Sequence, residues 1–425
     1  MRRNILRAVV ALVMLLYSES PSLGYSVLTH EAIIDSVWCD SLKPMIAERY
    51  PHANAEQLRE AYAYAYGGAL IQDMGYYPFG NKLFTDLTHY VRSGDFVEAL
   101  LSQSQDINEY AFALGALAHF AADNEGHSIA VNHAVPALYP KLRAKYGAEV
   151  TYGENPTAHI RTEFGFDVLQ VARGRYAPEN YRDFIGFKVS KPALERAFMA
   201  TYSLELKDVF ADTDLAIGSY RRAASVIIPK MIKVAWETKE DEIEKLTPGM
   251  TREKFIYSLP RAEYEKTWGN RYDKPGFEDK LLAFCFSIIP RFGPLKTLSF
   301  KPITPETERI FLDSFSATLE QYRAWLRQTR RGRLDLKNMN LDLGRGTRAG
   351  EYTLADEAYS DLLTKIAKHD FNNVTPELSK NILAYFSDLD APIAAKKDTD
   401  DWRKIALGLE KLKAAQLRIG RTVKR

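Results

Sequence analysis

Histidine is scarce in this 425-residue chain and unevenly distributed. Seven of the eight histidines lie in the first 160 residues. The densest stretch, AHFAADNEGHSIAVNHAV, contains His119, Asp123 and His127 at positions i, i+4 and i+8. On a helix this spacing places the three side chains on one face. A second pair, His159 and Glu163, repeats the i, i+4 spacing.

These two motifs together indicate a metal site. An imidazole or carboxylate that is buried without a partner costs several kcal/mol. A divalent cation removes this cost, and neutral imidazole and carboxylate are common zinc ligands. One His-x3-Asp motif alone is more often a hydrogen-bonded pair than a pair of ligands. Two such helical pairs close together in an exported protein favour metal binding.

Helices must position these residues. Apolar residues recur at helical spacing along the chain, and the period-2 alternation of strands is nearly absent. Segment 107–124 is apolar on most faces, which is typical of a helix in the centre of a bundle. We therefore expect an all-α fold whose first half is a multi-helix bundle. The expected helices are residues 31–42, 55–71, 95–102, 107–124, 191–210, 217–237, 306–328, 354–368, 376–387 and 400–419.

The chain is long enough for two domains. A polar, Arg- and Gly-rich segment at 327–350 reads as a linker, and a solvated linker is favoured there over a contact with an anionic partner. The predicted organisation is a signal peptide at 1–24, a metal-binding helical core at 25–175, a helical continuation or second helical domain at 176–326, the linker at 327–350 and a helical C-terminal region at 351–425.

The N-terminus has the features of a secretory signal. Arg2, Arg3 and Arg7 precede a short uncharged apolar run at 9–17, and small residues follow. This pattern predicts cleavage before Tyr25 and a secreted or periplasmic protein, with an uncleaved anchor as the alternative. Residues 1–24 contain three Arg and one Glu, so their removal takes the chain from a charge of +2 to zero. A neutral chain has no global basic field to attract nucleic acid.

Two further features concern membranes and thiols. The longest later apolar run, 281–290, is too short to span a bilayer and indicates a buried helix or an interfacial segment, so membrane contact is at most peripheral. Cys39 and Cys285 could form one disulfide, although we favour two buried thiols. Neither lies in a motif with histidine, which argues against a cysteine nucleophile or a cysteine-based zinc site.

The order of the polar motifs resembles the zinc-dependent phospholipase C family and the related fungal-type single-strand nucleases. In that superfamily the mature N-terminal residue chelates zinc through its amine and carbonyl oxygen, and the cluster holds up to three zinc ions in an all-α bundle. The resemblance covers residues 25–175. The ligands that it implies are Tyr25 through its main chain, His30, Asp73, His89, His119, Asp123, His127, His159 and Glu163.

Two positions depart from the family pattern. Tyr25 stands where the family has Trp, which matters little because the chelating atoms belong to the backbone. His127 follows Asp123 at a shorter spacing than in the relatives, so His133 is an alternative ligand. We favour His127 because it stays on the helical face of Asp123. His52 and His369 are expected to be surface residues.

The resemblance implies hydrolysis of a phosphate ester. Zinc lowers the pKa of bound water to roughly 7 and can stabilise the attacking and leaving oxygens at phosphorus. By resemblance Asp73 would be a ligand and a general base for the attacking water. Tyr76 and Tyr77 could bind a choline headgroup by cation–π contact, or stack a base. Packing is an equally good explanation for Tyr62, Tyr64 and Tyr66.

Three functions are therefore open. Phospholipase C-type cleavage of a phospholipid leads, because Glu163 and the bacterial type of export signal fit it best. A single-strand nuclease or nucleotidase of the same superfamily is second, and only that reading requires nucleic acid as a partner. The third is a non-catalytic exported helical protein with a structural metal cluster.

Overall fold

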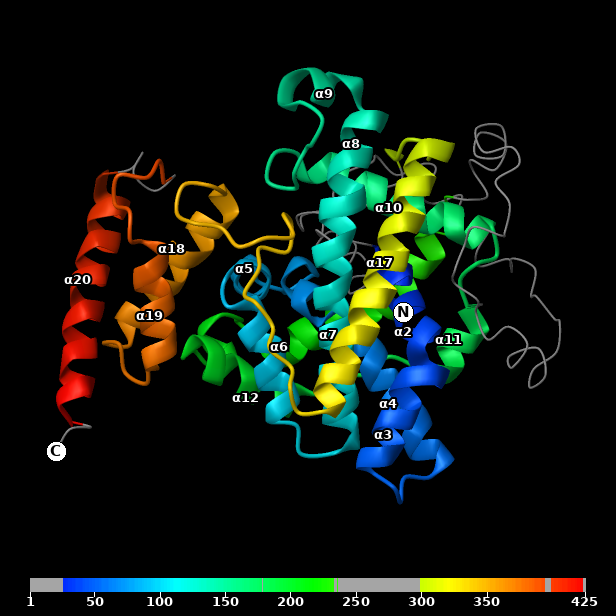
Figure 1. The fold of residues 1–425 in the computed structure, drawn as a ribbon, viewed down its shortest axis with the longest axis horizontal. Helices are drawn as coiled ribbons and strands as arrows, with labels where there is room; N and C mark the ends of the chain where they lie inside the picture. The colour runs from blue at the N-terminus through cyan, green and yellow to red at the C-terminus, as the bar shows by residue number, and fades with distance from the viewer. Residues whose placement is uncertain (1–25, 178, 233–234, 236–298, 394–398, 423–425) are drawn as a thin grey trace, which may run out of the picture.

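The computed structural model describes residues 26–177, 179–232, 235, 299–393 and 399–422, and every regular element in these ranges is helical (Figure 1). The expected all-α fold is confirmed. The first half contains α2 (Val27–Val37), the π-helix η1 (Trp38–Leu42), α3 (Lys43–Arg49), α4 (Ala55–Gly68), the 3-10 helix η2 (Ile71–Tyr76), α5 (Lys82–Tyr90), α6 (Ser93–Ser102), α7 (Ile107–Glu125), the π-helix η3 (Gly126–Val131), α8 (Asn132–Leu138), α9 (Pro140–Tyr146) and α10 (Pro156–Ala172). The remainder contains α11 (Glu179–Ile185), α12 (Lys191–Tyr202), η4 (Leu206–Asp208), α13 (Thr213–Arg222), η5 (Ala223–Ile227), α17 (Pro305–Arg330), α18 (Thr353–Lys368), α19 (Pro376–Tyr385) and α20 (Thr399–Thr422).

Helix α7 lies at the centre of the bundle, between α4, α6 and α17. Its N-terminus is capped by Asp106, whose side chain accepts hydrogen bonds from the backbone N–H groups of Asn108 and Glu109. Nearly every residue from Glu109 to Asp123 is buried, as the apolar composition of this segment predicts. A helix buried on all sides can bring polar side chains into the interior only where they have partners.

Helices α4 and α7 approach so closely that their backbones touch. A Cβ atom at Gly68 would lie 2.0 Å from the carbonyl oxygen of Phe112, and one at Gly115 would lie 2.1 Å from that of Ala65. Only glycine fits at these two positions. The approach also fixes the end of α4, next to η2 and the first acidic residue of the site.

Helix α17 runs along α7 and connects the C-terminal region to the bundle (Figure 1). It begins with Thr304 as its N-cap, followed by Pro305 in the first turn. The hydroxyl of Tyr322 donates to the carbonyl of Leu114 at 2.8 Å, and the ring of Trp325 lies 5.4 Å from that of Phe120. Helices α18, α19 and α20 follow at one end of the molecule, where α18 packs against α5.

The segment expected to be a polar linker divides into two parts. Helix α17 continues to Arg330, and residues 331–352 are then mostly irregular. This irregular segment runs along the bundle, and Ser93 at the start of α6 exchanges hydrogen bonds with the backbone of Met339. Leu341 and Asp342 are fully buried, so this part of the segment is a packed element of the fold.

Some predictions from the sequence are corrected or lie elsewhere. Cys39 is exposed, whereas a buried thiol was predicted, because it occupies the outer side of the π-helical turn after α2. The signal segment 1–24, Tyr25, the apolar run 281–290 and Cys285 lie outside the described residues. None of the helices in the described ranges is both long and apolar enough to span a bilayer.

Candidate metal centre

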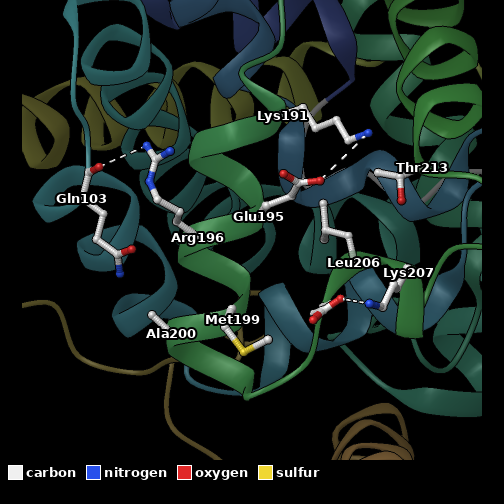
Figure 2. Close-up of a pocket in the computed structure, with 10 residues that line it drawn as sticks. Gln103, Lys191, Glu195, Arg196, Met199, Ala200, Leu206, Lys207 and Thr213 are labelled. Carbon is white, nitrogen blue, oxygen red and sulfur yellow. Dashed lines mark hydrogen bonds and ion pairs between the residues drawn. The ribbon is translucent and has the colours of Figure 1, made fainter. Parts of the chain in front are cut away.

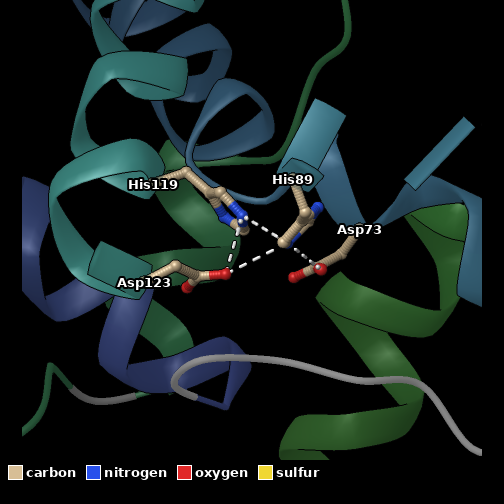
Figure 3. A group of neighbouring side chains, drawn as sticks. All are labelled: Asp73, His89, His119 and Asp123. Carbon is tan, nitrogen blue, oxygen red and sulfur yellow. Dashed lines mark hydrogen bonds and ion pairs between the residues drawn. The ribbon is translucent and has the colours of Figure 1, made fainter. Parts of the chain in front are cut away.

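Four of the predicted ligands form one compact buried group (Figure 3). These residues are Asp73, His89, His119 and Asp123, and their ligand atoms lie within 4.8 Å of one another. The Nε2 atom of His89 is 3.1 Å from Oδ2 of Asp123 and 3.4 Å from Oδ1 of Asp73. The Nε2 atom of His119 is 3.2 Å from the same Oδ2 and 3.4 Å from Nε2 of His89. Such separations match those between the ligands of a single metal ion.

Three elements bring this group together. The 3-10 helix η2 carries Asp73, the last turn of α5 carries His89, and one face of α7 carries His119 and Asp123. The i, i+4 spacing on α7 acts as the sequence predicted. Figure 3 shows the two imidazoles and two carboxylates converging from these elements on a common centre.

Backbone carbonyls fix the tautomer of each histidine in the group. The Nδ1 atom of His89 lies 2.9 Å from the carbonyl oxygen of Thr85, and that of His119 lies 3.1 Å from the carbonyl oxygen of Ala69. Because a carbonyl can only accept, each Nδ1 carries a proton, and Nε2 is the ring nitrogen of each histidine that faces the centre. Metal-bound histidines in proteins are oriented in this way.

His30 joins the same group from α2. Its Nε2 atom lies 3.5 Å from Oδ1 of Asp123, and its ring stacks on that of His119 with 4.7 Å between centroids. Asp167 on α10 holds the start of α2, because its carboxylate accepts from the backbone N–H groups of Leu28 and Thr29 at 2.9 and 3.0 Å. The N-terminal part of α2 is therefore fixed beside the group.

A second buried group contains His127, His159 and Glu163, whose ligand atoms also lie within 4.8 Å of one another. The Nε2 atom of His159 faces the carbonyl oxygen of Val150, so its Nδ1 is the atom turned toward Glu163, at 3.8 Å. His127 does not continue the helical stack of His119 and Asp123. Helix α7 ends at Glu125, and the wider turn of η3 carries His127 to the second group instead.

The protein atoms around these centres fit a cation. In the described part of the chain, both side-chain oxygens of Asp73 and Oδ1 of Asp123 are buried without a hydrogen-bond partner, and so are both ring nitrogens of His127. The two buried carboxylates repel one another unless positive charge lies between them. Zinc binds imidazole nitrogen and carboxylate oxygen in tetrahedral sites, which is the donor set found here.

The pKa values reflect the same charge distribution. Burial opposes the charge of His89, but Asp123 and Asp73 beside it raise its pKa well above the usual range. Burial also opposes the charge of Asp123, yet the three histidines around it hold its pKa well below the usual range. In the second group, burial and the neighbouring His127 lower the pKa of His159 to about 3. His159 is therefore a neutral imidazole, the form that binds metal.

The other predicted residues are placed as follows. His133 is half exposed and lies 3.8 Å from Glu149, so the structure brings His127, and not His133, to the second group. His52 and His369 are exposed, as predicted. Tyr76 and Tyr77 are buried near the groups, with hydroxyls that have no hydrogen-bond partner in the described part of the chain.

Asp342 was not among the predicted residues. It lies after α17, almost two hundred residues from the nearest motif, yet its Oδ1 atom is 3.5 Å from Nε2 of His127. No helical spacing or local motif connects it to the histidines. Its proximity arises only when the irregular segment packs onto the bundle.

A separate cavity of about 700 Å³ is found on the surface beside α12 (Figure 2). It is lined by Lys191, Glu195, Arg196 and Lys207 among others, and these cations already pair with acids. Lys191 lies 2.6 Å from Asp214, for example. None of the metal-group residues lines it, so it is not the candidate centre.

The sequence comparisons agree with this geometry. The family model for zinc dependent phospholipase C matches residues 29–212, somewhat less than half of the chain. Searches of curated proteins and of solved structures gave no match. The matched range includes every member of the two groups and ends before the irregular segment that carries Asp342. Residues 29–212 are therefore similar to the zinc-dependent phospholipase C family.

Proposed function

We propose that this protein is an exported zinc-dependent hydrolase that cleaves a phospholipid headgroup ester, as a phospholipase C does. The observation that carries the proposal is the pair of buried histidine–carboxylate groups within the matched range, with ring nitrogens oriented by backbone carbonyls. Export rests on the N-terminal sequence, which has a basic, apolar and small-residue order.

The residues have distinct roles in this proposal. His30, Asp73, His89, His119 and Asp123 would hold metal in the first group, together with the main chain of Tyr25, and His127, His159 and Glu163 in the second. Bound zinc would supply Lewis-acid stabilisation of phosphate oxygens and hydroxide at neutral pH. The second oxygen of Asp73, Oδ2, has no hydrogen-bond partner among the described residues. We assign that oxygen to orienting the attacking water.

Tyr76 and Tyr77 are the proposed substrate residues. Tyr76 lies next to Tyr152, with 6.3 Å between ring centroids, and Tyr152 in turn meets the ring of His159 edge-on. An aromatic face next to the phosphate site suits a quaternary ammonium headgroup. Phosphatidylcholine is therefore the substrate to test first.

The test combines metal content with product analysis. We expect the purified protein to contain zinc and to release diacylglycerol and phosphocholine from phosphatidylcholine vesicles. Chelator should abolish the release and added zinc should restore it. His119→Gln should lose both activity and zinc, because it removes a lone pair from the first group. Metal is measured by elemental analysis and product by chromatography.

His133→Gln is the matched control, since His133 is partly exposed and belongs to neither group. It should retain zinc and activity. Full activity in His119→Gln would refute the site. Chelator-sensitive cutting of single-stranded DNA without lipid hydrolysis would instead identify the nuclease reading of the same superfamily.

One observation favours a second candidate, a structural metal centre. All seven residues of the two groups are at most 1% exposed. Structural zinc sites are closed by protein, whereas catalytic sites keep an open position. Zinc retention without turnover of either lipid or nucleic acid would establish this second candidate.

A further inference from the structure

His127 differs from His89, His119 and His159 in the hydrogen bonds of its ring. His89, His119 and His159 each place one ring nitrogen against a backbone carbonyl, which leaves the other nitrogen for metal. Neither ring nitrogen of His127 has a hydrogen-bond partner among the residues that the structure describes. The charged atom beside its Nε2 is Oδ1 of Asp342, at 3.5 Å.

Asp342 is buried in a position that the protein builds with several contacts. Its Oδ2 atom accepts hydrogen bonds from the hydroxyls of Tyr90, at 2.7 Å, and Tyr352. Its backbone carbonyl accepts from the side chain of Asn132 at 2.9 Å. Its Oδ1 atom has no hydrogen-bond partner within the described ranges. The carboxylate is therefore held by one oxygen while the other faces His127.

The same contacts tie the segment to both metal groups. The backbone N–H of Leu341 donates to the carbonyl of His89 at 3.2 Å. The hydroxyl of Tyr352 accepts from the backbone N–H of Gly153, in the loop whose Val150 carbonyl orients His159. Gly344 has a φ of 66°, and a Cβ there would lie 2.8 Å from that of Ser128, next to His127. The segment lies directly on the turn that carries His127.

We propose that Asp342 is a positioning residue for the metal centre: its Oδ1 accepts a hydrogen bond from the Nε2–H of His127, which directs Nδ1 of that ring to the second group. A carboxylate in this place orients the ring and makes it a stronger ligand. Asp342 is not a member of the second group, whose ligand atoms lie close to one another. This agrees with a residue that contacts His127 and does not bind the metal itself. The 3.5 Å separation must shorten by about 0.5 Å to become a full hydrogen bond.

This inference rests on the proposed zinc site and adds a residue from outside the matched family range. It predicts that the centre requires the segment after α17. The family portion alone would then hold the second metal ion weakly, because no described residue within it makes a hydrogen bond to the ring of His127.

The test measures zinc affinity of the full-length protein by competition with a chelator, using Asp342→Asn and Asp342→Ala. The asparagine keeps the size of the side chain and one acceptor oxygen, which can accept either from the tyrosine hydroxyls or from His127. We expect the zinc ion of the second group to bind about 10-fold more weakly in Asp342→Asn and up to about 100-fold more weakly in Asp342→Ala. The affinity of the first group for zinc should change little. Visible absorption of the cobalt-loaded protein gives a second readout of the same ligand set.

Asp335→Asn is the control, because Asp335 lies in the same segment but is exposed and pairs only with Lys337 in the described structure. Equal zinc affinity in the parent and both Asp342 variants would show that Asp342 is purely structural. Equal, severe losses in both variants would make it a direct ligand and refute the positioning role. If the parent chain bound no zinc, the proposed zinc-dependent function would be wrong. The experiment therefore distinguishes a failure of the proposed function from a failure of the role assigned to Asp342.

Discussion

Asp123 is the residue on which the first group depends. Its two oxygens face three histidines from three helices, at 3.1 to 3.5 Å. A buried polar group without a partner is costly, because the interior offers no water with which it could form a hydrogen bond. A second buried carboxylate, Asp35, is stabilised by neutral hydroxyl groups and not by histidines. It accepts hydrogen bonds from the hydroxyls of Tyr62 and Tyr66, and no cationic side chain of the described residues lies at hydrogen-bond distance from it.

Asp35 yields a prediction about pH. Burial raises its pKa to about 6, despite the two tyrosine hydroxyls that favour its charge. The unfolded chain titrates near 3.9, so between about pH 4 and pH 6 only the folded state holds the proton. Stability therefore falls as pH rises through this window. Asp35→Asn removes this loss. Its free energy of unfolding should therefore rise relative to that of the parent by on the order of 2 kcal/mol as the pH goes from 4 to 8.

Urea unfolding of the parent and Asp35→Asn at pH 5 and pH 8 measures this difference, since both variants experience the same changes elsewhere. Asp313→Asn is the control, because Asp313 lies on the exposed side of α17. A difference between parent and Asp35→Asn that is the same at both pH values would contradict the buried charge as the cause.

At the scale of elements, the contact between α4 and α7 determines how the site is oriented. Ala69, at the end of α4, accepts the hydrogen bond from Nδ1 of His119. Gly115 lets this part of α4 approach α7, because a Cβ there would lie 2.8 Å from the backbone nitrogen of Ala69. The close packing of α4 on α7 therefore sets the tautomer of His119, because it places the carbonyl of Ala69 against Nδ1.

We expect Gly115→Ala to destabilise the protein by about 1–3 kcal/mol through overpacking, and to weaken zinc binding as Ala69 moves. Thermal unfolding and zinc content would be measured together. Gly218→Ala is the matched control, because Gly218 also lies inside a helix but a Cβ there would meet nothing within 4 Å. This control should gain up to about 1 kcal/mol from helix propensity. Similar effects of the two substitutions would exclude the close contact as the cause.

At the scale of the whole molecule, α17 joins the matched family range to the rest of the chain. Glu308 at its start is fully buried and pairs with Arg175 at 2.9 Å and with Arg173 at 3.3 Å. The phenol of Tyr322 and the ring of Trp325 extend the contact along α7. The segment with Asp342 follows directly, so its position depends on where α17 packs.

Glu308→Gln should destabilise the protein by about 3 kcal/mol, because it leaves Arg175 with a charge in a buried environment. Urea unfolding of the full chain measures the loss. Glu48→Gln breaks the exposed pair of Glu48 with Arg330 at the other end of the same helix, and should cost less than about 1 kcal/mol. Comparable losses in the two variants would show that burial of the Glu308 pair has no special weight.

The sequence alone predicted the helical class, because amphipathic spacing and capping are local properties. The limits of α6, α7, α17 and α18 agree closely with the expected ranges. It also predicted which histidines and carboxylates gather, since the His119–Asp123 and His159–Glu163 pairs are local to one helix each. Local spacing could not give the division into two groups, because the π-helical turn η3 departs from the regular helical repeat.

The place of Asp342 was decided only by the tertiary structure. Nothing within its own segment, with its arginines, glycines and alternating polar residues, distinguishes this carboxylate from its neighbours. Its role arises because α17 packs along α7 and returns the chain to His89 and His127. Sequence fixes contacts within a few turns of helix, whereas contacts between distant segments follow from which apolar faces can be buried together.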